Sequence, residues 1–77
     1  MTEYNFLEEF SENLKDMMKQ QNMDTNDLAH KTGLSNMSIN RYLNAKHMPS
    51  AKSIVNLSIV LDCEIDDLIP VYNIITD

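Results

Sequence analysis

The segment NMSINRYLN, residues 36–44, is rich in side chains that can contact the edges of DNA bases. An Asn amide can form two hydrogen bonds to adenine, an Arg guanidinium can bond guanine, and a Met can touch the thymine methyl group. A helix rotates by about 100° per residue, so if Ile39 faces inward the polar side chains of the segment face outward. These are Met37, Asn40, Arg41 and Asn44, with Asn36 in the first helical turn.

Charge is distributed unevenly along the chain. The formal net charge is −6, which taken alone argues against a polyanionic partner. Residues 28–61, however, contain no Asp or Glu and have a charge of +4, from Lys31, Arg41, Lys46 and Lys52. The flanking segments hold all twelve acids and only Lys15 and Lys19, which gives −10. An acid-free segment suits contact with phosphate, since each carboxylate there would be repelled.

Composition predicts one small helical domain. A chain of 77 residues with 43% hydrophobic residues, one Gly and no Trp suits a compact helical protein with a thin core. One Cys cannot form an internal disulfide, and the acidic N-terminal segment has no apolar signal core. No apolar run approaches the roughly 20 residues of a membrane span. We therefore expect a soluble cytoplasmic protein without membrane contact.

The sequence gives no support for catalysis. It has no Gly-rich phosphate loop, no nucleophile beside a base and no evident pair of catalytic carboxylates. His30 and His47 have no second ligand at metal spacing, and Cys63 is expected to pack as a small hydrophobic residue. The sequence thus predicts a protein that is not an enzyme, with no metal, cofactor or small-molecule ligand.

Five helices are predicted from hydrophobic spacing and capping residues. Asp24, Ser35 and Ser50 each precede a predicted helix and can cap its free N–H groups, while Pro49 prevents helix continuation. Apolar residues at spacings of three and four define the inner faces. The predicted helices span residues 5–21, 25–31, 36–44, 51–61 and 65–69.

The second and third predicted helices have the pattern of a helix-turn-helix. A small residue, Ala29, permits close crossing of the two helices, and Gly33 can take a positive φ in the turn. Leu34 is apolar and can fix the turn to the core, while Ile39 faces inward to pack against the preceding helix. Together these four features are fairly specific for a helix-turn-helix, although each alone is weak evidence for it.

The segment LAHKTGLSNMSINRYLNAKHMPSAKSIVNLSIVLDCEIDDLI, residues 28–69, resembles the DNA-binding domain of the XRE family, which includes Cro and the lambdoid phage repressors. The resemblance implies an all-α, five-helix bundle of the lambda-repressor-like type, with the third helix as the recognition helix. It also implies a sequence-specific regulator that binds DNA as a dimer. Leu43, Ala45 and Asp62 depart from the family pattern, which often has Glu, Gly and Gly there.

The resemblance assigns roles to particular residues. Base contact is implied for Asn36, Met37 and Arg41, and the outward face of the helix adds Asn40. Phosphate contact is implied for Thr25, Asn44 and Lys46, while Ser38 suits either role and is grouped with the phosphate contacts. Lys31, His47 and Lys52 lie nearby in the sequence, but only their charge favours a contact.

The favoured function is a DNA-binding transcriptional regulator, a small repressor of the phage or mobile-element kind that binds a palindromic operator. The alternative is a protein-binding module on the same fold, an antirepressor or antitoxin with little DNA affinity because of its net acidity. We expect a DNA-binding domain over residues 1–70 and an apolar tail over 71–77 that either forms a homodimer interface or folds back on the core. The interface candidates are Ile65, Ile69, Val71, Tyr72 and Ile74.

Overall fold

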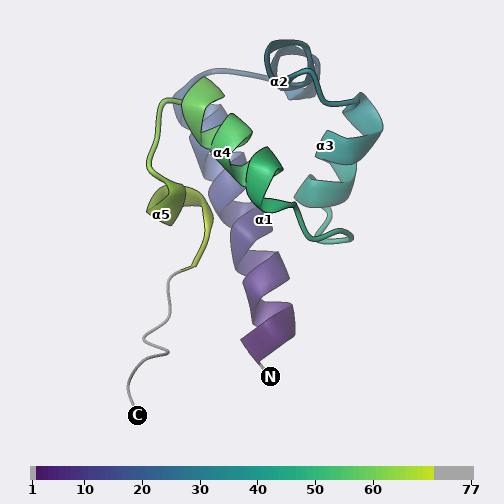
Figure 1. Cartoon of the computed structure of the whole chain (residues 1–77), viewed down its shortest axis with the longest axis vertical. Helices are drawn as coiled ribbons and strands as arrows, with labels where there is room; N and C mark the ends of the chain where they lie inside the picture. The colour runs from purple at the N-terminus through teal and green to yellow at the C-terminus, as the bar shows by residue number, and fades with distance from the viewer. Residues whose placement is uncertain (1, 71–77) are drawn as a thin grey trace.

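The computed structural model describes residues 2–70, which form five helices and no strand (Figure 1). The predicted all-α class and the number of helices are confirmed. The first helix begins three residues earlier than predicted, and the remaining helix ends lie within one residue of their predicted positions. The predicted start of the first helix depends on the apolar stripe, whose first member in the sequence is Phe6. The helices are α1 (Thr2–Gln20), α2 (Thr25–Thr32), α3 (Asn36–Leu43), α4 (Ala51–Val60) and α5 (Ile65–Leu68).

The long helix α1 runs through the middle of the bundle in the view of Figure 1. It packs against α3 and against α5, which lie on opposite sides of it in this view. The α2 helix packs against α3 and α4, and α4 also packs against α5. None of the described helices combines the length and the hydropathy that a membrane crossing requires.

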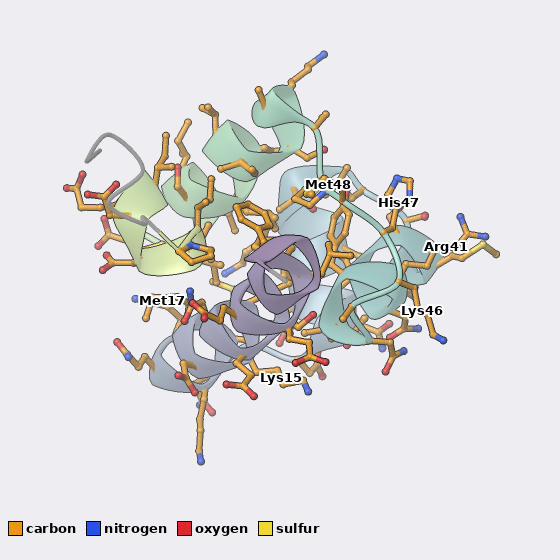
Figure 2. The ribbon with its side chains drawn as sticks, turned by 90° about the horizontal axis from the view of Figure 1, so that it is seen from below. Lys15, Met17, Arg41, Lys46, His47 and Met48 are labelled. Carbon is orange, nitrogen blue, oxygen red and sulfur yellow. The ribbon has the colours of Figure 1, made fainter. Side chains whose placement is uncertain are left out.

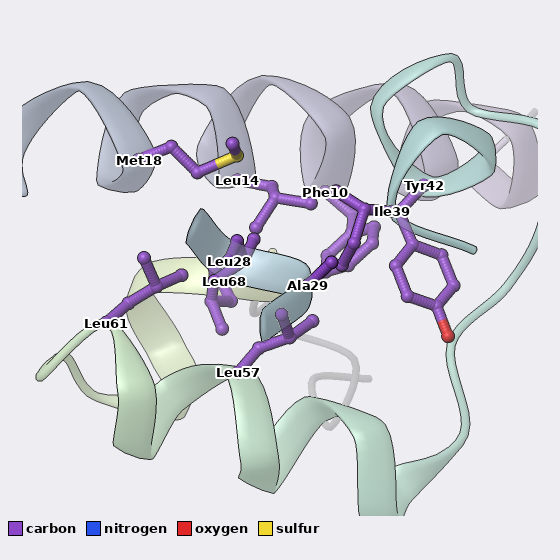
Figure 3. Packing of buried hydrophobic residues seen from close by; sticks show 10 residues of the cluster. All are labelled: Phe10, Leu14, Met18, Leu28, Ala29, Ile39, Tyr42, Leu57, Leu61 and Leu68. Atoms are coloured by element: carbon purple, nitrogen blue, oxygen red, sulfur yellow. The ribbon is translucent and has the colours of Figure 1, made fainter. Parts of the chain in front are cut away.

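A single hydrophobic core holds the five helices together (Figure 3). Every helix contributes at least one side chain with no measurable exposure, so no helix is merely attached to the surface. Each buried side chain of this size stabilises the fold by about 1.5–3 kcal/mol relative to an exposed one. The fully buried residues are Phe10, Leu14, Leu28, Ile39, Leu57, Leu61 and Leu68.

Side chains cap the helices where the sequence predicts it. Asp24 and Asp27 form a capping box at α2, in which the Asp27 N–H donates to Asp24 Oδ1 at 2.8 Å and the Asp24 N–H donates to Asp27 Oδ2 at 3.2 Å. Ser35 accepts from the Ser38 N–H at the start of α3, and Ser50 caps α4 in the same way. These bonds satisfy N–H groups that have no partner within the helix.

Within residues 2–70, four residues have positive φ, and each follows the end of a helix. Gly33 ends α2 at φ 78°, as predicted, and Asn22 follows α1 at φ 57°. Ala45 and Asp62, which replace glycines of the family pattern, have φ values of 56° and 54°. Asp tolerates this conformation better than Ala does, because its short polar side chain can bond locally, so Ala45 is the more strained of the two.

Candidate nucleic-acid interface

The α2–α3 pair has the helix-turn-helix packing that the sequence predicts. Ile39 of α3 is fully buried and Ala29 of α2 is nearly so, which allows the two helices to pack closely. Leu34, in the turn, is half-buried against the same core. These three contacts fix the direction in which α3 presents its outer face.

Hydrogen bonds from Thr32 and Asn56 hold the turn in place. The Thr32 hydroxyl donates to the Leu28 carbonyl at 2.7 Å and accepts from the Leu34 N–H at 3.2 Å. The Asn56 side-chain amide of α4 donates to the Thr32 carbonyl at 2.7 Å, which ties the end of α2 to α4. Neither side chain could be assigned this role from the sequence, because their partners are backbone atoms whose position depends on the folded turn.

The outer face of α3 is polar and open to solvent. Met37 is 61% exposed, and Asn36, Asn40, Arg41 and Asn44 are exposed as well. Met37, Asn40, Arg41 and Asn44 lie on the side away from the buried Ile39, as the helical spacing predicts, and Asn36 is exposed in the first turn. All four candidate base-contact residues are therefore accessible on one element, although their contact with bases stays a prediction.

The four predicted phosphate contacts lie around this face, from the first turn of α2 to the loop after α3. Thr25 begins α2 and is half-buried, and Ser38 is half-buried in the first turn of α3. Asn44 ends α3, and Lys46 follows in an exposed position. Their arrangement frames the outer face of α3 on two sides.

Asn26 of α2 contacts one of the candidate base-reading residues. The Asn36 side-chain amide donates to Asn26 Oδ1 at 2.9 Å, so the two helix starts are linked through their side chains. This bond leaves one N–H and the carbonyl oxygen of the Asn36 side chain available to a base edge. Sequence spacing alone does not reveal the pair, because the two residues meet only after the helices cross.

Tyr42 connects the α3–α4 loop to the core. Its ring is buried in a T-shaped contact with the Phe10 ring, at a centroid distance of 5.9 Å, and the Ser11 hydroxyl donates to the Tyr42 carbonyl oxygen. On the other side, the His47 ring stacks on Tyr42 at 6.1 Å with an interplanar angle of 23°. His47 lies on the α3 side of the molecule together with Arg41 and Lys46 (Figure 2).

The acidic face of α1 reaches the border of this surface. Glu8 and Glu12 line an open hollow with Ser11, Lys15 and the segment Leu43–Ala45. Leu43, which replaces a family Glu, is half-buried against the core. A duplex that contacts the end of α3 therefore approaches the carboxylates of α1.

Within residues 2–70 no three His, Cys, Asp or Glu side chains are arranged to hold a metal ion. Burial raises the pKa of the Cys63 thiol above its ordinary value, and the carboxylates of Asp67, Asp62 and Glu64 raise it further. A protonated thiol is a poor nucleophile and a poor metal ligand. Cys63 packs against the core, in agreement with the prediction of a structural role.

The predicted dimer residues fall into two groups. Ile65 is 41% exposed on α5, whereas Ile69 is half-buried against the core, and Val71, Tyr72 and Ile74 lie outside the described residues. The structure adds an exposed residue that the sequence analysis did not single out, Ile59 of α4, which is 71% exposed. Val55, one turn earlier on α4, is also exposed.

Comparison with known proteins confirms the resemblance to the XRE family. A model of the Cro/C1-type helix-turn-helix DNA-binding domain matches residues 13–72. No curated protein matches the chain.

Several solved structures share the fold. The restriction-modification controller protein C.AhdI from Aeromonas hydrophila superposes with a TM-score of 0.77 at 22% identity, over 80% of this chain and 94% of that one. An HTH_3 family transcriptional regulator from Vibrio cholerae has a TM-score of 0.79 at 15% identity, and hydroxypropylphosphonic acid epoxidase from S. wedmorenis has 0.78 at 26%. These two matches cover 84% of this chain but only 36% and 35% of the respective proteins, so the chain spans about a third of their length.

Proposed function

The chain belongs to the Cro/C1-type helix-turn-helix family of DNA-binding transcriptional regulators, and we propose that it is a repressor that reads the major groove with α3. In this proposal the side chains on the outer face of α3 contact base edges. Asn side chains suit adenine, the guanidinium suits guanine, and the thioether suits a thymine methyl group. The proposed base contacts are Asn36, Met37, Asn40 and Arg41.

The outer face of α3 is the observation that supports this proposal most strongly. Its side chains are exposed opposite the buried Ile39, and the surrounding segment of residues 28–61 has no acid. An exposed helix face usually has charges of both signs. Here the absence of acids removes the groups that phosphate repels, while it leaves amides and cations that can bond bases.

Phosphate contacts would position α3 in the groove. Thr25 lies at the start of α2, where its hydroxyl can donate to a phosphate oxygen beside the capping box of Asp24 and Asp27. Ser38, Asn44 and Lys46 frame α3 on its other border and can bond the backbone of the same duplex. These groups orient the protein without reading sequence.

A single α3 contacts only a few base pairs, so we propose that two copies bind a palindromic operator. A two-fold axis would place the two recognition helices about 34 Å apart, which is one turn of DNA. The proposed interface comprises Ile65, Ile69, Val71, Tyr72 and Ile74, with residues 1–70 as the DNA-binding domain and 71–77 as its tail. The exposed Ile59 of α4 supports an apolar contact near α5.

Truncation after Ile69 tests the interface. If the tail forms the dimer, the truncated protein stays folded, sediments as a monomer and binds half-sites poorly. If it unfolds, or dimerises as the full chain does, the tail belongs to the core or has no role in assembly.

Selection of bound sequences from a random duplex pool tests the function as a whole. We expect one enriched motif with two-fold symmetry and half-sites about one helical turn apart. A pool that stays random after several rounds would contradict sequence-specific recognition.

A second candidate is a protein-binding module on the same fold, an antirepressor or antitoxin. The net charge of −6 and the exposed Ile59 and Val55 favour it. A mobility-shift experiment at low salt, with sheared genomic DNA and random duplexes, separates the two. The regulator shifts these duplexes, whereas the protein-binding module leaves them unshifted.

A further inference from the structure

His47 is the histidine of the α3–α4 loop, and it is not among the proposed contacts with bases or phosphates. Its ring lies on the Tyr42 ring at 6.1 Å, and the two planes differ by 23°. Tyr42 is itself held by Phe10 and by the Ser11 hydroxyl. The exposed His47 therefore stacks on the ring of a residue that belongs to the hydrophobic core. Figure 3 shows Tyr42 among the other core residues.

The loop is also fixed by its backbone, so the position of His47 does not depend on the stack alone. The Lys46 N–H donates to the Arg41 carbonyl at 2.8 Å, and the Ala45 N–H donates to the Tyr42 carbonyl at 3.2 Å. These bonds fold the loop back onto the end of α3. In Figure 2 the side chains of Arg41, Lys46 and His47 consequently extend from the same side of the molecule.

We propose that His47 is a proton-dependent phosphate contact: its protonated imidazole donates to a phosphate oxygen beside the one that Lys46 contacts. This inference rests on the docking proposed above. Histidine is the side chain whose ordinary protonation range lies between pH 5 and 8, so DNA binding would take up a proton there. The stack on Tyr42 suits the charged ring, because a cation is attracted to an aromatic face.

Charged groups lie within the α3–α4 loop and on the elements next to it, which are α3, α4 and α1. Arg41 belongs to α3, Lys46 to the loop and Lys52 to the first turn of α4. From α1, the carboxylates of Glu8 and Glu12 and the ammonium group of Lys15 line the hollow beside Asn44 and Ala45. All of these are present with and without DNA, so the change in charge around His47 on binding comes from the phosphates.

The consequence is a DNA affinity that rises as pH falls. Residues 28–61 supply only four permanent cations, so one further cation is a substantial fraction of the total. We expect the full chain to bind its selected duplex about three- to tenfold more tightly near pH 6 than near pH 8. The salt dependence should also be steeper near pH 6, by roughly 0.9 in the slope of log K against log salt, since one more phosphate is neutralised.

Three variants test the assignment. His47→Phe keeps a ring on Tyr42 but cannot be protonated, so its affinity should match the wild type near pH 8 and lose the gain near pH 6. His47→Lys is charged at both pH values, so it should bind tightly at both. His30→Gln is the matched control, since it removes the exposed histidine of α2 and should leave the pH profile of the wild type unchanged.

Two results would overturn the proposal and are distinguishable. Specific binding with the same pH profile and salt slopes in the wild type and His47→Phe would refute the phosphate contact alone. Absence of specific binding by the wild type at both pH values would refute the proposed function and the contact together. Circular dichroism of each variant at both pH values shows whether a loss of affinity reflects unfolding.

Discussion

Residues 28–61 and the segments that flank them share one hydrophobic core but differ in surface charge. The middle segment has a charge of +4 and presents amides, a guanidinium and a thioether on α3, while the flanks have −10 and present carboxylates on α1 and α5. Both parts contribute buried apolar residues to one cluster. The difference therefore lies at the surface, where net charge says less about a DNA-binding protein than the distribution of that charge.

The acidic flanks favour DNA that is docked through α3 over DNA that is bound non-specifically in another orientation. A duplex docked through α3 meets mainly cations and amides and approaches the α1 carboxylates only at the border of this surface. A duplex in another orientation meets the acidic faces of α1 or α5 directly. We expect weak non-specific affinity with a modest salt slope, roughly −0.9 for each phosphate neutralised. Tight, sequence-independent binding at physiological salt would be inconsistent with this division of the surface.

The largest predicted effect concerns the packing that aims α3. Ala29→Leu should lower the free energy of unfolding by about 1–3 kcal/mol, because the longer side chain overpacks the α2–α3 contact. Urea unfolding monitored by circular dichroism measures the loss as a shift in midpoint. Ala51→Leu at an exposed position of α4 is the matched control and should change the midpoint little. Equal midpoints for Ala29→Leu and the wild type would show that the helix-turn-helix is misplaced.

The next prediction separates base contact from phosphate contact. Arg41→Ala should cost about 1–3 kcal/mol on the selected duplex and relax the preference at one base pair, if the guanidinium bonds guanine. Fluorescence anisotropy with the selected duplex and single-base-pair variants gives both numbers. Lys19→Ala on α1 is the control in the flank. An equal loss for Arg41→Ala on specific and random duplexes would leave only a phosphate role.

Positive φ values in the two loops that flank α3 lead to predictions of opposite sign for the free energy of unfolding. Gly33→Ala should lower the free energy of unfolding by about 1 kcal/mol, because φ is 78° although no atom lies within 4 Å of the added Cβ. Ala45→Gly should raise it by up to about 1 kcal/mol, because it relieves a residue at φ 56°. Asp62→Gly should gain less than Ala45→Gly, since Asp tolerates this conformation better.

Thermal unfolding of these three variants measures the differences. A loss of stability in Ala45→Gly comparable to that of Gly33→Ala would mean that the extra freedom of Gly in the unfolded chain outweighs the relief of strain. In that case φ alone does not explain the family preference at this position.

The smallest predicted effect concerns the border between the two regions. Glu12→Gln removes a carboxylate from the hollow beside Asn44 and Ala45, and should raise affinity for random duplexes about twofold at low salt. Glu64→Gln on the α5 side is the matched control and should leave that affinity unchanged. No difference between the two variants would show that the position of the α1 acids does not matter for discrimination.

The sequence was sufficient to predict features that follow from local chemistry. The caps at Asp24, Ser35 and Ser50, the positive φ at Gly33 and the inward face of α3 all depend on residues close together in the chain. The pairs Asn26–Asn36 and Tyr42–His47 were not predicted, because they depend on where a helix or loop lies after folding. The exposure of Ile59 was missed for a similar reason, since hydrophobic spacing does not show which side of a short apolar helix remains uncovered.

The most direct test of the central claim is an NMR titration of isotope-labelled protein with the selected duplex. We predict that the largest shifts occur in the outer face of α3, the start of α2 and the α3–α4 loop, including the side-chain amides of Asn36 and Asn40 and the Arg41 guanidinium. The resonances of Asp66 and Asp67 on α5, and of Glu9 on α1, should move little. Large shifts on α4 and α5 with an unchanged α3 would contradict DNA recognition through this helix.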